Sequence, residues 1–274
     1  MWLTWNWAVL VAALLTAAVV FTRPNGRHWL VVARAFAKET ALIFSLYAIW
    51  QLAGTLSVVQ VNGARGRGLW IWHAQRDLHF PSELTFQKAV LPHPLIVQFF
   101  NGYYAIMHVP ALVIFLIWLF VRHRDRYGSV RNAIALLTGI CLVIQLIPVA
   151  PPRMFPALGF VDTAKLYNQS VYGAVGSGLA DQLSAMPSVH VGWAVAVGLV
   201  AVQVSRSRWR WLALIHPILT VLAVTVTANH WWLDGVVAVA ILLFVMAAQR
   251  GVRAARRRYP TSWQEVSLEA QAVS

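Results

Sequence analysis

Cysteine and charged residues are both scarce in this chain of 274 residues. Charged residues make up 11% of the sequence, Asp and Glu together number nine, and hydrophobic residues make up 59%. One water-soluble core cannot bury so much apolar surface, so the composition excludes an ordinary soluble domain and indicates a polytopic membrane protein. The single cysteine, Cys141, lies in an apolar run. It excludes an internal disulfide and a cysteine-based metal site, and we expect it to be a small core residue.

Seven apolar runs are long enough to be read as helices that cross the hydrocarbon layer of about 30 Å. The sequence therefore predicts an all-α transmembrane bundle. Its spans are expected at residues 2–21, 41–61, 102–121, 133–149, 189–204, 211–228 and 233–248. The first run has no positive charge before it and no convincing cleavage site after it, which indicates a retained helix rather than a signal peptide.

These runs suggest three parts. Residues 1–40 would hold the first helix and a cytoplasmic loop, residues 41–250 a six-helix membrane domain, and residues 251–274 a basic and polar cytoplasmic tail. Within the second part, residues 68–90 mix aromatic and charged side chains, a pattern typical of a helix that lies at the membrane interface. Residues 150–185 form the longest loop, and long loops in compact proteins are usually functional.

The formal net charge of +13 raises the possibility of a nucleic-acid partner. However, the basic residues fall in short loops between alternate apolar runs, so they indicate membrane orientation, and we expect no nucleic-acid partner. The basic loops lie within residues 23–38, 122–131, 206–210 and 250–258. Because positive loops stay in the cytoplasm, we expect the N-terminus outside, the C-terminus inside and the site described below on the outer side.

The stretch Asn229-His230-Trp231-Trp232-Leu233-Asp234 carries the first chemical signal. His230 and Asp234 are four residues apart, so on a helix they share a face and the carboxylate can orient the imidazole. This is how a nucleophilic or basic histidine is built. The two tryptophans are expected to mark the membrane boundary.

The stretch Ala185-Met186-Pro187-Ser188-Val189-His190 carries the second signal. A Pro-Ser pair opens a helix whose unpaired N–H groups, together with the Ser188 hydroxyl, can bind a phosphate. His190 lies close enough to protonate a leaving oxygen. Arg153 follows Pro151-Pro152 at the end of an apolar run, where a guanidinium is costly unless it meets an anion, and its planar fork matches phosphate oxygens.

Three further residues are candidates to line a substrate cavity at this site, namely Tyr104, His108 and Asn229. His108 shares a helical face with Tyr104, although a histidine that only packs fits the same pattern. Nothing resembles a zinc motif such as His-Glu-x-x-His, and we expect neither a metal nor another cofactor.

Taken together, an Arg after one span, Pro-Ser-x-His at the start of the next and His-x-x-x-Asp two spans on resemble the three motifs of the type 2 phosphatidic acid phosphatase superfamily. The resemblance covers residues 101–250 and implies six core helices preceded by one extra. It also implies roles. His230 would attack phosphorus, and Asp234 would orient the His230 ring. His190 would act as the general acid, and Arg153 and Ser188 would hold the phosphate of a membrane lipid.

The chain departs from the superfamily pattern at five positions. Leu146 and Val224 stand where the pattern has Lys and Arg, Ala223 replaces its Ser, Val189 its Gly and Met154 its Pro. The overall combination is more similar to the inositol phosphorylceramide synthase branch, which transfers phosphorylated head groups between lipids. Fewer cations favour a phosphodiester, which carries less charge than a phosphomonoester.

Several alternatives remain open at this stage. The acceptor could be a second lipid, as in a head-group transferase, or water, as in a phosphatase of phosphatidic acid or polyprenyl phosphate. Transfer could pass through a covalent intermediate or occur directly with His230 as base. A non-enzymatic transporter or scaffold would instead use His190, His230 and Asp234 to relay protons or support packing. The oligomeric state is left open.

Overall fold

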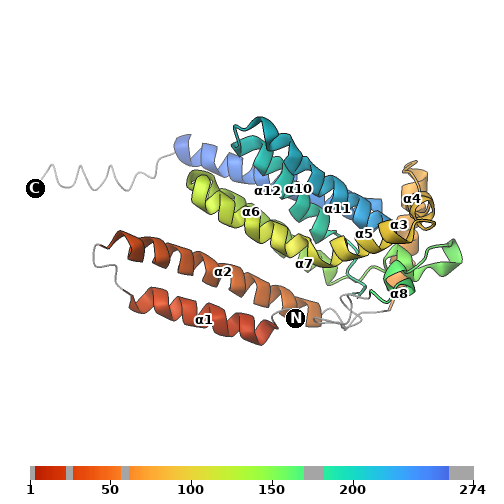
Figure 1. Ribbon diagram of the computed structural model, residues 1–274, viewed down its shortest axis with the longest axis horizontal. Helices are drawn as coiled ribbons and strands as arrows, with labels where there is room; N and C mark the ends of the chain where they lie inside the picture. The colour runs from red at the N-terminus through yellow and green to blue at the C-terminus, as the bar shows by residue number, and fades with distance from the viewer. Residues whose placement is uncertain (1–3, 23–26, 57–61, 170–181, 259–274) are drawn as a thin grey trace, which may run out of the picture.

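The computed structural model describes residues 4–22, 27–56, 62–169 and 182–258, which form a bundle of long helices with short helices gathered at one end (Figure 1). The elements in chain order are α1 (Trp5–Phe21), α2 (His28–Leu56), α3 (Ala64–Asp77), α4 (Glu83–Val90), α5 (Pro94–Ile106), α6 (His108–Arg122), α7 (Arg124–Gln145), the 3-10 turns η2 (Pro152–Met154) and η3 (Pro156–Leu158), α8 (Thr163–Leu166), α10 (Val189–Val204), η4 (Arg208–Leu214), α11 (Ile215–Val226) and α12 (Trp232–Arg258). Within the described ranges no strand occurs, and one isolated bridge joins Val149 to Ser184. The expected all-α fold is confirmed.

Helices coincide with all seven apolar runs, although their ends differ from those expected. Among the described residues, three helical segments are long and apolar enough to cross a membrane, and the bent pair α5 and α6 would make a fourth. The three are Arg124–Gln145, Arg208–Val226 and Trp232–Ala255. Helices α1 and α10 are apolar but shorter, with 17 and 16 residues. The chain is therefore a membrane protein, and the number of seven spans stays a prediction.

Some helix ends bear on the expected division of the chain. Helix α2 begins at His28 and runs through the boundary expected at residue 40, and α12 continues to Arg258, so basic residues expected in the tail extend a helix. Residues 57–61 and 259–274, which belong to the second expected span and the tail, lie outside the described residues. The division into three parts stays a prediction.

The third expected span is a pair of helices rather than one. Helices α5 and α6 meet at Met107 with a bend of 53°. Pro110 explains the break, because proline has no N–H to donate to the carbonyl of Ile106 and its ring crowds that carbonyl. The bend places His108 at the very start of α6.

The segment expected as one interfacial helix, residues 68–90, is divided between α3 and α4. The chain turns between them at His79, whose φ of 59° lies in the left-handed region that ends a helix. In the expected outer loop, residues 150–185, the structure shows η2, η3 and α8, while residues 170–181 lie outside the described residues. Helices α3, α4 and α8 lie at the end of the bundle opposite the C-terminal end of α12 (Figure 1).

Helix α10 is the centre of the bundle and packs against α6, α7, α11 and α12. Two glycines permit this close approach. A Cβ at Gly192 would lie 2.9 Å from the Leu137 side chain, and one at Gly198 would lie 2.9 Å from the Pro217 ring. Small residues let apolar helices pack closely in membrane proteins. Cys141 of α7 is fully buried in the same core, as expected.

Helices α1 and α2 form a pair at one side of the bundle, and α2 also contacts α7 (Figure 1). Arg131 of α7 forms an ion pair with Glu39 of α2, and Arg34 Nε donates to the Val19 carbonyl oxygen at 3.0 Å. These polar contacts connect the pair internally and to the rest of the protein.

Candidate active site

The first turns of α10 and α12 meet at the end of the bundle where the short helices gather. Ser188 is the N-cap of α10, and its Oγ accepts a hydrogen bond from the backbone N–H of Val191 at 3.4 Å. Its own N–H donates to the Asp234 carbonyl oxygen at 3.0 Å, which joins the two helix starts. The expected Pro-Ser helix start is confirmed. The positive end of the α10 dipole and the buried Ser188 hydroxyl face this junction, where they favour an anion.

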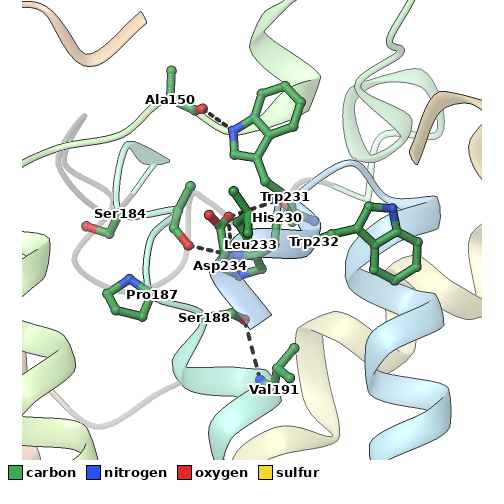
Figure 2. A network of polar contacts seen from close by, with 12 residues as sticks. Ala150, Ser184, Pro187, Ser188, Val191, His230, Trp231, Trp232, Leu233 and Asp234 are labelled. Carbon is green, nitrogen blue, oxygen red and sulfur yellow. Dashed lines mark hydrogen bonds and ion pairs between the residues drawn. The ribbon is translucent and has the colours of Figure 1, made fainter. Parts of the chain in front are cut away.

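His230 lies in the short loop before α12 and is 4% exposed. Its Nδ1 is 2.6 Å from the Ala185 carbonyl oxygen and 3.4 Å from Asp234 Oδ2 (Figure 2). Both neighbours are acceptors, so the neutral ring carries its proton on Nδ1 and leaves the lone pair on Nε2. Nε2 is buried and has no hydrogen-bond partner among the described residues. It is therefore the atom available for attack on a ligand.

The surroundings of His230 favour its neutral form. Burial lowers the pKa of His230 below the ordinary value of 6.5, the hydrogen bond to Ala185 opposes that shift, and the charge of Arg153 lowers the pKa further. A neutral imidazole is the nucleophilic form. Asp234 is held in place as well, because its Oδ2 accepts the Trp231 N–H at 2.8 Å.

Arg153 projects from η2 and is 7% exposed. Its Nη1 donates to Asn229 Oδ1 at 2.6 Å and its Nη2 to the Gln182 carbonyl oxygen at 3.2 Å. The Asn229 amide in turn donates to Thr227 Oγ1 at 2.7 Å. This chain of contacts places a positive charge beside the residue that precedes His230. Asn229 is thus an orienting contact of Arg153 in addition to a candidate for lining the cavity.

Three aromatic rings continue the site away from His230. The His190 ring lies 5.7 Å from that of His230, 4.4 Å from that of His108 and 5.0 Å from that of Tyr104. His190 is partly exposed, whereas His108 is 4% exposed. Among the described residues, His190 Nδ1 and both ring nitrogens of His108 have no hydrogen-bond partner.

The structure thus brings all the expected site residues into one connected group. They are Ser188 and His190 at the start of α10, His230 and Asp234 at the start of α12, Arg153 and Asn229 in the adjoining loops, and Tyr104 and His108 at the junction of α5 and α6. In the described part of the chain, no group of three or more His, Cys, Asp or Glu side chains is placed to hold a metal ion.

Two further polar residues at this site were not expected from the sequence. Gln75 of α3 and Glu83 of α4 are fully buried and accept the N–H groups of Leu233 and Trp232 at 2.9 and 3.0 Å. Gln75 Nε2 also donates to Glu83 Oε1 at 2.7 Å. The two side chains therefore cap the first turn of α12, just after His230. In the sequence they stand among apparently interfacial charges, and only their burial distinguishes them.

The expectation that both tryptophans mark the membrane boundary is wrong for Trp231. This side chain is 1% exposed, and its Nε1 donates to the Ala150 carbonyl oxygen at 3.0 Å (Figure 2). It packs against Trp72, Phe155 and Phe160. Trp231 is thus a core residue that fixes the loop carrying His230 to the end of the bundle where the short helices gather.

Comparison with known proteins gives one match. A family model described as the PAP2 superfamily matches residues 69–248. This range includes every site residue named above and begins before the expected 101–250, so that it takes in most of α3 and all of α4. No curated protein and no solved structure matches the chain significantly.

Proposed function

Because the chain belongs to the PAP2 superfamily, we propose that it is a lipid phosphatase or head-group phosphotransferase in which His230 is the nucleophile. The observation that carries this proposal is the state of the His230 ring. Its Nδ1 is paired with acceptors, its Nε2 is buried and has no partner in the described part of the chain, and His190 is in ring contact. A nucleophile, an orienting carboxylate and a neighbouring acid are the parts that covalent phosphoryl transfer needs.

In the first half of the reaction, one bond to phosphorus forms and one breaks. His230 Nε2 attacks phosphorus to form a P–N bond, and the P–O bond to the alcohol breaks. His190 gives its proton to the leaving oxygen. Asp234 and the Ala185 carbonyl stabilise the positive charge that develops on the His230 ring.

The second half reverses these steps with a new acceptor. Water or an alcohol attacks phosphorus, its proton passes to His190, and the P–N bond breaks to restore His230. Direct attack by the acceptor, with His230 as base, uses the same residues but forms no P–N bond.

The phosphate would lie between Arg153 and the start of α10. The Arg153 guanidinium, the Ser188 hydroxyl and the α10 dipole favour negative charge at that place. No Lys or Arg stands at Leu146 or Val224, where the superfamily pattern has its other cations. We therefore favour a phosphodiester substrate and transfer of the inositolphosphotransferase type, with simple hydrolysis of lipid phosphates as the alternative. The distribution of positive loops along the sequence supports a site on the outer side of the membrane.

The test uses purified protein in lipid nanodiscs. Phosphatidic acid and phosphatidylinositol are offered in turn, each with ceramide as acceptor, and free phosphate and new lipids are followed by mass spectrometry. Wild-type protein should convert at least one donor, and His230→Ala should lose at least 10³-fold in rate, a loss on the order of that seen when a nucleophile is removed. His73→Ala, a change at an exposed histidine of α3 at the same end, is the matched control.

The outcomes separate the alternatives. Free phosphate alone supports a phosphatase, and a new phosphodiester lipid supports a head-group transferase. Acid-labile labelling of wild-type protein by a ³²P-labelled donor, absent in His230→Ala, supports the covalent route. Conversion of neither donor would contradict the proposal and favour a non-enzymatic membrane role. Full activity in His230→Ala would contradict the assignment of His230 as the nucleophile.

A further inference from the structure

His108 is a buried polar residue of the site to which the mechanism above gives no task. It begins α6 at the bend after Met107 and is 4% exposed, yet both of its ring nitrogens lack a hydrogen-bond partner among the described residues. Buried polar atoms in native proteins are nearly always satisfied, so such a pair needs an explanation. One explanation is a bound ligand group that supplies the missing hydrogen-bond partners.

The neighbours of His108 point to the kind of group it binds. Its ring lies 4.4 Å from the His190 ring and edge-on to the rings of Tyr103 and Tyr104, at 6.0 and 5.6 Å. His190 Nδ1 likewise has no hydrogen-bond partner within the described ranges. Two histidine rings with unsatisfied nitrogen atoms, one from each of two helices, therefore lie in contact, with tyrosine rings beside them.

The hydrogen-bonding pattern selects between a phosphate and a hydroxyl. A neutral imidazole has one donor and one acceptor nitrogen, whereas an ionised phosphate has acceptors only and can pair with the donor nitrogens of the two rings alone. A hydroxyl both accepts and donates, so it can accept from the donor nitrogen of His108 and also donate to an acceptor nitrogen of His190. The fixed positive charge lies elsewhere, because Arg153 contacts Asn229 beside His230.

We propose that His108, together with His190, forms the subsite for the alcohol hydroxyl that leaves phosphorus in the first half of the reaction and attacks it in the second. This inference rests on the proposed function and adds the substrate class of the acceptor, a lipid alcohol. His108 holds the hydroxyl oxygen and does not change its own protonation. The proton moves between that oxygen and His190, and the bonds to phosphorus form and break as described above.

The test is exchange of an isotope-labelled alcohol into the donor lipid. The donor is whichever of phosphatidic acid and phosphatidylinositol is turned over faster, and deuterated diacylglycerol is the acceptor probe, since diacylglycerol is the leaving alcohol of both. The measured quantity is the ratio of deuterated donor formed to donor hydrolysed. Both products arise after the same first half-reaction, so the ratio reports how the acceptor is chosen.

Two substitutions separate hydrogen bonding from packing. His108→Phe keeps an aromatic ring against the tyrosines but has no hydrogen-bonding atom, and it should lower the ratio about tenfold, as loss of one hydrogen bond does. His108→Gln keeps a donor and an acceptor and should stay within about threefold of wild type. The matched control, His123→Phe at the opposite end of α6, should leave the ratio unchanged.

Each result decides the matter. A lower ratio in His108→Phe with recovery in His108→Gln supports the subsite. The subsite is refuted if His108→Phe keeps the wild-type ratio, or if both variants lower the ratio equally, because either result shows that His108 only packs. It is also refuted if wild-type protein hydrolyses the donor without any exchange. These failures leave the proposed function standing, whereas wild-type protein that turns over neither donor refutes the proposed function itself. Thermal unfolding in detergent confirms that each variant is folded.

Discussion

The buried carboxyl of Glu83 gives the sharpest prediction about how the protein holds its site. Glu83 Oε1 accepts hydrogen bonds from the Trp232 N–H at 3.0 Å and from Gln75 Nε2 at 2.7 Å. Glu83→Ala leaves both buried donors unsatisfied, at a cost of about 1–3 kcal/mol each, so the free energy of unfolding should fall by about 2–6 kcal/mol. Glu83→Gln keeps an amide oxygen for both donors and should lose less than about 1 kcal/mol.

The assay is denaturant unfolding of the protein in detergent, followed by tryptophan fluorescence, with Asp77→Ala as an exposed acidic control on α3. Equal losses of unfolding free energy in Glu83→Ala and Glu83→Gln would refute the argument, because they would show that the hydrogen bonds to Oε1 do not stabilise the fold. Activity should fall in Glu83→Ala as well, since the first turn of α12 sets the position of His230.

The pH dependence of stability supplies an independent check on the same carboxyl. Burial raises the pKa of Glu83 above its ordinary 4.5, and this effect exceeds the opposing hydrogen bonds from Trp232 and Gln75 and the nearby charge of Arg76. A raised pKa means that the folded state favours the protonated form, so the stabilising contribution is complete below pH 4.5 and is lost as the pH rises through the folded-state value. Glu83→Gln should therefore become more stable relative to wild type as the pH rises above 4.5. A constant difference would show that the carboxyl does not titrate differently in the two states.

Three further predictions concern catalysis. Asp234→Asn should lose about 10–10²-fold in kcat, less than His230→Ala, because the Ala185 carbonyl at 2.6 Å still fixes the imidazole tautomer; equal losses would contradict this. The acid limb of kcat/KM should have its midpoint below pH 6.5, since the lowered pKa keeps His230 neutral there, and a midpoint above 6.5 would refute it. Arg153→Lys should raise KM about tenfold with folding intact, because lysine lacks the planar fork that contacts Asn229 and Gln182, and an unchanged KM would remove Arg153 from phosphate binding.

Local spacing explains what could be predicted of the fold and the site. The pairing of His230 with Asp234 follows from four residues of helix, and the Ser188 cap follows from Pro-Ser before an apolar run. The bend before α6 could also have been predicted, because Pro110 stands inside the apolar run. These features depend on neighbours in the sequence and need no knowledge of tertiary packing.

The caps of α12 could not be predicted in this way. Glu83 and Trp232 are 149 residues apart in the chain, and nothing in the sequence around Glu83 distinguishes a buried carboxyl from an interfacial one. Trp231 is a similar case, because a tryptophan beside a span fits a membrane boundary until the packing around it is known. In both cases the burial of the side chain depends on contacts between residues far apart in the sequence.

The positions that depart from the superfamily pattern show how the site keeps its shape with fewer cations. Ala223 and Val224, which replace a Ser-Arg pair, are buried near the end of α11. The Val224 carbonyl accepts the Asn229 N–H at 2.9 Å, and the Ala223 carbonyl accepts the Thr227 hydroxyl at 2.6 Å. Backbone groups at these positions thus hold the loop that presents His230, whatever side chains they carry. Losing the arginine removes positive charge without releasing the loop, which supports a substrate of low negative charge, and comparing phosphatidylinositol with phosphatidic acid as donors tests that preference directly.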